Sequence, residues 1–228
     1  MRKIYQKAII MLSVACMGYA TPAFAADAIV KTNKAWLSGA THIYGRMTVS
    51  GITSSNIKEK GFCYSSVNQM PTVEDGTSKI YLSNQGEIYN ISQLKPATVY
   101  YIRAYVKKTN GDVVYGDPVK AITRPKGGVT YNINDGFPSD VLTRVQAAAK
   151  EAIDLWNEYT GIHGLHITIN YGAQTQTADC SYGGWMRIGP NASYQKTGTL
   201  LHEMLHAIGV GTHGTWQNSF LRSNTTSG

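Results

Sequence analysis

The stretch that decides how the second half of this chain folds is LLHEMLHAIGVGTH, from Leu200 to His213. Its apolar residues recur at helical spacing, and residues four apart on a helix share one face. His202 and His206 therefore point the same way, while Glu203 lies about 100° around the helix axis from His202. The pattern predicts a helix that gathers polar side chains on one side.

We expect this helix to cover residues 195–208 and to stop at Gly209, because glycine readily adopts the left-handed conformation that ends many helices. The remaining face should pack on the core of a domain. The residues expected to lie largely on that buried side are Leu201, Leu205 and Ile208.

Two imidazoles at this spacing can bind one Zn²⁺ ion through their ring nitrogens. Zinc lowers the pKa of a bound water toward about 7, and a nearby carboxylate can remove its proton as the water attacks a carbonyl. Glu203 is placed to be this general base and to pass the proton to the leaving amine. The helix thus predicts His202 and His206 as metal ligands and Glu203 as the catalytic residue.

Over about residues 128–213 the chain resembles the metzincin clan of zinc peptidases, whose motif is His-Glu-x-x-His-x-x-Gly-x-x-His. In that clan the glycine lets the chain turn so that the third histidine reaches the zinc. Here Thr212 holds the third ligand position, and the histidine follows one residue later as His213. We expect Gly211 to permit a wider turn and His213 to be the third protein ligand.

The resemblance implies an α+β domain over residues 128–228 in which a strand, a long helix, a strand, an edge strand and the site helix follow one another. The sequence agrees with that order. It predicts strands at 129–134, 166–171 and 184–189, and a helix capped by Ser139 or Asp140 that stops near Gly161.

In the metzincin clan the edge strand pairs with an extended substrate, a form of β-augmentation. The resemblance gives this role to Gly184, Trp185 and Met186. The acidic residues of the long helix have the spacing of an ordinary solvated face; they are Glu151, Asp154 and Glu158.

The same clan has a turn with a methionine below the metal, downstream of the third histidine. No methionine follows His213 in this sequence, so the resemblance implies either a domain truncated at its C-terminus or a minimal one. A different zinc clan takes its third ligand from a downstream carboxylate. Residues 204–228 contain no Asp or Glu, which excludes that arrangement for this stretch.

The first half of the chain predicts an all-β sandwich over residues 28–125. Short runs rich in β-branched and aromatic residues alternate with turn signals, and Asn110-Gly111-Asp112 has the composition of a hairpin turn. The expected strands are 36–40, 43–47, 60–64, 100–106 and 119–123. A Pro/Gly linker at 124–128 separates the two domains.

Residues 94–106, which read LKPATVYYIRAYV, resemble the later strands of fibronectin type III-like modules. The resemblance implies that Leu94 and the tyrosines pack between two sheets. Such modules are usually spacers or adhesion units, so we expect contacts with a cell surface or a glycan and no catalysis here. His42 is expected to be a structural residue of this domain.

The N-terminus predicts export. Arg2, Lys3 and Lys7 precede a short apolar run and a small-x-small site at 23–25, which is the design of a signal peptide over residues 1–25. We therefore expect a secreted, periplasmic or cell-surface protein. The apolar run is too short for a permanent membrane helix, and no second long apolar segment follows it.

The whole chain has a formal net charge of +7, and a mature chain without residues 1–25 would carry +4. No cluster of cations is interleaved with aromatic residues, so nucleic-acid binding has no support. Cys63 and Cys180 would remain after export, either as a disulfide or as two buried thiols, and their places in different domains favour thiols.

These features predict an exported zinc metalloendopeptidase that hydrolyses peptide bonds of a protein or peptide substrate, preceded by a fibronectin type III-like domain. The alternative is a secreted adhesion or glycan-binding protein whose peptidase-like domain is inactive, through the altered spacing to His213 or through a missing C-terminal part. Retention of Glu203 favours the enzyme.

Overall fold

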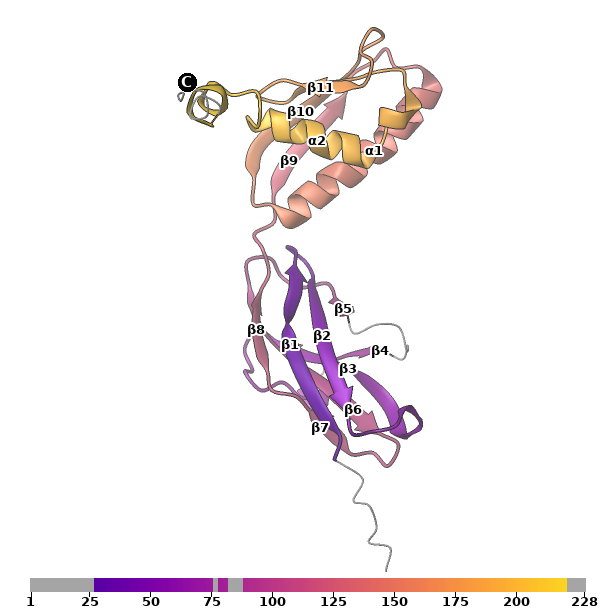
Figure 1. Ribbon diagram of the computed structural model, residues 1–228, viewed down its shortest axis with the longest axis vertical. Helices are drawn as coiled ribbons and strands as arrows, with labels where there is room; N and C mark the ends of the chain where they lie inside the picture. Colours follow the sequence, from indigo (N-terminus) through magenta and orange to yellow (C-terminus); the bar gives the residue numbers. More distant parts are fainter. Residues whose placement is uncertain (1–26, 76–77, 82–87, 221–228) are drawn as a thin grey trace, which may run out of the picture.

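The computed structural model describes residues 27–75, 78–81 and 88–220 of the chain, which form two domains (Figure 1). The predicted signal peptide lies outside these residues. Within them, no helix is both long and apolar enough to cross a membrane.

The first domain is a β-sandwich, as the sequence predicts. One sheet has the order β1-β2-β5, formed by β1 (Ile29–Ser38), β2 (Ile43–Ser50) and β5 (Ile88–Ile91). The other has the order β4-β3-β6-β7, and β8 also pairs with β6. Its strands are β3 (Ile57–Ser65), β4 (Ser78–Tyr81), β6 (Val99–Lys108), β7 (Val113–Tyr115) and β8 (Val119–Ile122).

The core of the sandwich lies between these sheets and draws heavily on β6. Tyr100 and Ile102 are buried at alternate positions of that strand, as a half-buried strand requires. Leu94 is buried too, and the Tyr100 hydroxyl accepts a hydrogen bond from the backbone N–H of Lys95 (2.9 Å). This bond fixes the corner that leads into β6, an arrangement similar to the tyrosine corner found in other β-sandwiches. The predicted packing is confirmed for Leu94 and Tyr100, whereas Tyr101 is only half-buried and neither it nor the buried Tyr105 belongs to this core cluster.

The second domain has one sheet with the order β11-β12-β10-β9. Its strands are β9 (Gly128–Ile133), β10 (His163–Tyr171), β11 (Ala178–Cys180) and β12 (Trp185–Ile188). The neighbours β9, β10 and β12 run parallel, whereas β11 is antiparallel to β12. Its two α-helices are α1 (Ser139–Tyr159) and α2 (Thr197–Ala207), and two short helical segments, Ala192–Tyr194 and Trp216–Phe220, flank α2 in sequence. A parallel strand pair joined through a helix, as in β9-α1-β10, places that helix on a face of the sheet.

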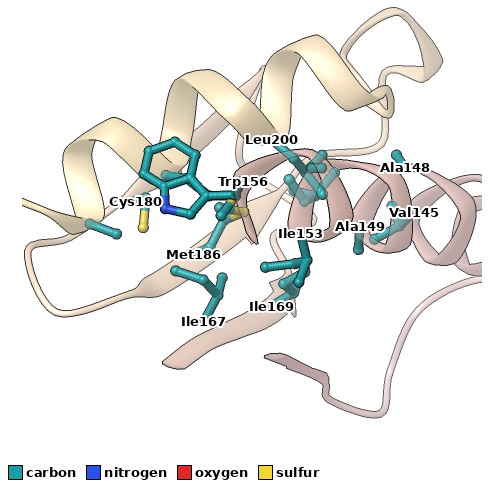
Figure 2. Packing of buried hydrophobic residues seen from close by; sticks show 14 of the residues in the cluster. Val145, Ala148, Ala149, Ile153, Trp156, Ile167, Ile169, Cys180, Met186 and Leu200 are labelled. Carbon is teal, nitrogen blue, oxygen red and sulfur yellow. The ribbon is translucent and has the colours of Figure 1, made fainter. Parts of the chain in front are cut away.

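Both helices pack on the same buried face of this sheet. Ile167, Ile169 and Met186 on the strands meet Trp156 of α1 and Leu200 of α2 in one cluster (Figure 2). Alternate strand residues face solvent, and they include Thr130, Asn132, His166 and Arg187. The sheet is therefore covered on one side only.

The start of α1 differs from the prediction. Pro138 is the N-cap residue and Ser139 is already helical, so neither Ser139 nor Asp140 caps the helix from outside. Proline suits a helix start because it has no N–H to leave unpaired. Asp140 lies in the first turn, where a carboxylate interacts favourably with the helix dipole.

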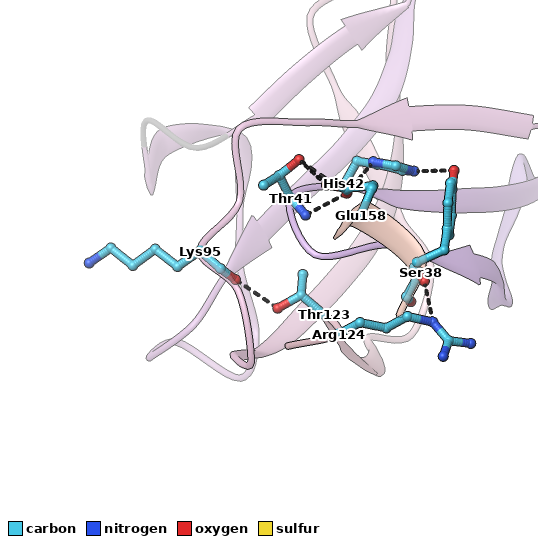
Figure 3. A network of polar contacts seen from close by, with 8 residues as sticks. Ser38, Thr41, His42, Lys95, Thr123, Arg124 and Glu158 are labelled. Atoms are coloured by element: carbon cyan, nitrogen blue, oxygen red, sulfur yellow. Dashed lines mark hydrogen bonds and ion pairs between the residues drawn. The ribbon is translucent and has the colours of Figure 1, made fainter. Parts of the chain in front are cut away.

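The end of α1 binds the turn between β1 and β2, which joins the two domains (Figure 3). Glu158 Oε1 accepts a hydrogen bond from the backbone N–H of Thr41 (2.7 Å) and lies 2.8 Å from Nδ1 of His42. Because the carboxylate can only accept, Nδ1 carries a proton, and in the neutral ring Nε2 accepts from the Tyr159 hydroxyl (2.9 Å). The Ala40 N–H donates to the Glu158 carbonyl oxygen (2.8 Å).

These contacts confirm the structural role of His42 and correct the interpretation of Glu158. Its side chain is 17% exposed and is held by the other domain, so it is not part of a solvated face. Asp154 does belong to such a face, since it pairs with Lys150 in the open.

Candidate metal centre

The motif lies on α2, whose C-terminal end is built as the sequence predicts. Gly209 has φ +104°, its N–H donates to the His206 carbonyl oxygen (3.0 Å), and the Val210 N–H donates to that of Leu205 (3.0 Å). These two bonds form a Schellman motif, which closes the last turn of a helix. The chain therefore leaves α2 sharply just after His206.

His202 and His206 are neighbours on α2, with ring centroids 5.0 Å apart and ring planes nearly perpendicular. His206 Nδ1 lies 2.7 Å from the Val210 carbonyl oxygen. A carbonyl can only accept, so Nδ1–H is the donor and Nε2 of the neutral ring keeps its lone pair. A histidine that ligates a metal usually donates its other N–H in this way.

Glu203 lies between the two histidines in sequence and is only 6% exposed. In the described part of the chain its carboxylate forms no hydrogen bond and no ion pair with Lys or Arg. Burial raises the pKa of Glu203, and the electrostatic influence of the nearby His206 and His202 opposes that rise in part. Since an unpaired buried carboxylate is costly, this position calls for a cation or another compensating partner.

His213 lies apart from this pair. Its ring packs edge-on against Tyr182, with centroids 4.7 Å apart, and its Nδ1 accepts the Thr215 N–H (3.1 Å). His213 lines a separate pocket beside Trp216, and Thr212 folds back so that its hydroxyl donates to the His206 carbonyl oxygen (2.6 Å). The one residue by which the spacing exceeds the motif is thus accommodated in the turn after α2, where Thr212 folds back on the helix end.

The structure brings together two of the three predicted ligands. Across residues 27–75, 78–81 and 88–220, no group of three or more His, Cys, Asp and Glu side chains is arranged to hold a metal ion. His202 and His206 fit zinc by donor type, by spacing and by the free Nε2 of His206. His213 would have to leave Tyr182 to join them.

The expectation for the substrate-binding edge strand is wrong in its position. Residues 185–188 form β12, which pairs with β10 on one side and β11 on the other, so it has no free edge. Gly184 is buried and has φ +97°, and its carbonyl oxygen accepts the Thr168 N–H (2.8 Å). Met186 is fully buried, and Trp185 projects from the sheet face rather than along an edge. The edge next to α2 is β11.

Beside His202 and Glu203 lies a cleft with a volume of about 350 Å³. Five further residues line it, and none of them was predicted as a site residue: Thr177, Tyr194, Lys196, Gly198 and Thr199. The spacing of Lys196, Thr199 and Glu203 at i, i+3 and i+7 is a helical stripe, and this was the available signal.

Cys180 is buried on β11 close to Glu203. The pKa of its thiol is raised to about 12, mainly by burial and further by the negative charge of Glu203. It is therefore a neutral thiol, and the bridge to Cys63 that the sequence left open is not formed between these two described, free cysteines.

Comparisons with known proteins found likeness at the level of β domains. No family model matches the chain, and no curated protein matches it. Among solved structures, the 6th fibronectin type III domain from human fibronectin type III domain containing protein 3 is 22% identical, with a TM-score of 0.31, covering 48% of this chain and 88% of that one. The fn3 domain of human contactin 1 is 17% identical, with a TM-score of 0.32, covering 51% and 96%.

A third similar solved structure is the sensor domain of the anti-sigma factor RsgI4 in Pseudobacteroides cellulosolvens. It is 16% identical, with a TM-score of 0.30, covering 42% of this chain and 94% of that one. Likenesses this weak assign no function, and the sandwich is established by its own strand pairing.

Proposed function

We propose that this chain is an exported zinc-dependent metalloendopeptidase of metzincin type, whose active site is on α2. The observation that supports this most is the Glu203 carboxylate, which is buried, without a partner in the described chain, and open to a cleft beside two adjacent histidines. A helix built only for packing would hold an apolar residue at this position.

In this proposal His202 and His206 hold the zinc, and His213 completes the protein ligands by moving away from Tyr182. When bound, zinc supplies Lewis-acid activation of the carbonyl and of water. Glu203 takes the proton of the attacking water on a carboxylate oxygen and delivers it to the nitrogen of the leaving amine. Its raised pKa makes it a stronger base than an exposed glutamate.

Metal content and cleavage test this proposal together. The purified full chain, loaded with zinc and dialysed, should retain about one zinc per molecule. His202→Ala and His206→Ala should lose it, whereas His163→Ala, a change at the exposed start of β10, should keep it. Cleavage of an unfolded protein should fall at least about 100-fold in Glu203→Ala, the usual effect of removing a general base.

The position of His213 favours one rival function, a secreted adhesion or glycan-binding protein with an inactive peptidase-like domain. Zinc retention without any cleavage by the full chain would support this rival. His213→Ala separates the two functions further. Zinc affinity should fall if His213 is a ligand, and it should not change if His213 is only a surface histidine. Absence of zinc binding would overturn the metal site itself.

A further inference from the structure

The cleft beside Glu203 extends along α2 toward the start of the helix. His202 and Glu203 lie at one end of it, and Lys196, Thr199 and Tyr194 line the rest. Lys196 directly precedes α2 and Glu203 is seven residues further on, so their backbones are roughly 10 Å apart along the helix axis, and both residues line this cleft. The cleft thus joins the proposed catalytic base to a lysine.

Lys196 stands where a cation is unfavourable. It is the N-cap residue of α2, its side chain makes no cap hydrogen bond, and the first turn after it reads Thr-Gly-Thr without an acid. The N-terminus of a helix carries partial positive charge, so anions are stabilising there and cations are not.

Nothing in the described residues neutralises Lys196 on the side of the cleft. Its ammonium takes part in no ion pair or hydrogen bond among them. Glu151 does reach the start of α2, where it accepts a hydrogen bond from the Thr197 hydroxyl, but it lines a different pocket, formed mainly by α1, and not the cleft. The cleft end of α2 is therefore a positive position beside two hydroxyls, those of Thr199 and Tyr194.

We infer that Lys196 is a specificity-determining residue that binds the carboxylate of an acidic side chain in the peptide substrate. The inference rests on the proposed function, since it takes Glu203 as the point next to the scissile bond. An extended peptide advances about 3.3 Å per residue, so roughly 10 Å places the acidic residue two or three positions from that bond. The hydroxyls of Thr199 and Tyr194 can donate to the same carboxylate.

A cleavage assay tests this preference. A cleavage site is first mapped in an unfolded protein, and peptides of that sequence are made with Glu or Gln two or three positions away on either side. The full chain should cleave one Glu peptide with a kcat/KM about five-fold above its Gln partner, the scale of an exposed ion pair. Lys196→Glu should abolish or invert the preference, and Lys126→Glu, the same change in the exposed linker, should keep it.

Unfolding does not explain a loss of preference in Lys196→Glu, because an acid at a helix start is favourable. A measurement of peptide binding without cleavage separates this inference from the proposed function. Fluorescent Glu and Gln peptides are titrated into the full chain bearing Glu203→Gln, and the Glu peptide should bind about five-fold more tightly unless Lys196→Glu is added. A wild-type chain that cleaves nothing would refute the peptidase; equal binding of both peptides, or equal cleavage, would refute the role of Lys196.

Discussion

Cys63 and Cys180 show how burial sets the chemistry of a single residue. Burial raises the pKa of each thiol from 9.0 to about 12. The reactive form of cysteine is the thiolate, so both side chains should be inert in the folded protein at pH 8. We expect iodoacetamide to modify neither residue in the native chain and both in urea, as read by mass spectrometry of the peptides that contain them.

The sign of the linkage follows from the direction of these shifts. A raised folded-state pKa means that the stabilisation from the neutral thiols is complete below the unfolded value near 9 and is lost as the pH rises through about 12. Rapid labelling of Cys180 at pH 8 without denaturant would show an accessible thiolate beside Glu203 and would contradict its burial.

At the scale of the element, α2 shows what a sequence can and cannot predict. Its end was predictable, because Gly209 is the residue that can adopt φ +104° after an apolar helix. Its buried face was not. Leu200, Met204 and Ala207 are buried, whereas Leu205 and Ile208 are each 39% exposed, contrary to the expectation from spacing. Of the three residues expected on the buried side, only Leu201 packs against the core, and it is half-buried.

The reason is that the apolar residues of α2 span about half of its circumference, a wider arc than the core covers, while His202, Glu203 and His206 occupy the rest. Two stripes, one with Leu200 and Met204 and one with Leu201 and Leu205, have the same period, so periodicity alone cannot choose between them. The prediction that residues 184–188 form the edge strand was wrong for a similar reason. β11 has three residues and no measurable period, while the alternation of β12 fits an edge strand and an interior strand equally.

The two stripes of α2 make a direct stability prediction. Leu200→Ala and Met204→Ala should each lower the free energy of unfolding by about 2–5 kcal/mol, because they leave cavities in the core. Leu205→Ala, the matched change on the other stripe, should cost less than about 1 kcal/mol. Urea denaturation of the three variants measures the free energy of unfolding. A larger decrease in Leu205→Ala than in Leu200→Ala and Met204→Ala would show that the stripe with Leu205 is the buried one.

On the scale of the whole molecule, the sequence predicted two domains but not how they join. Glu158 has the same helical spacing as Asp154, and nothing local distinguishes them. Only the fold brings Glu158 to Thr41 and His42, which are more than a hundred residues away in the chain. The histidine pair of the site was predictable because its spacing is local, whereas the position of His213 depends on a turn and on Tyr182.

The junction itself can be tested with one substitution. Glu158→Ala removes the acceptor of the Thr41 N–H and hydroxyl and the partner of His42, which should cost about 1–3 kcal/mol for the groups left unpaired. Because this contact holds the end of α1 against the sandwich, the linker at 124–128 should open more often, and limited trypsin digestion should cut after Lys126 faster. Asp154→Ala is the control, since it removes an acid one helical turn earlier that pairs only with exposed Lys150. Equal digestion rates for the two variants would mean that Glu158 does not hold the domains together.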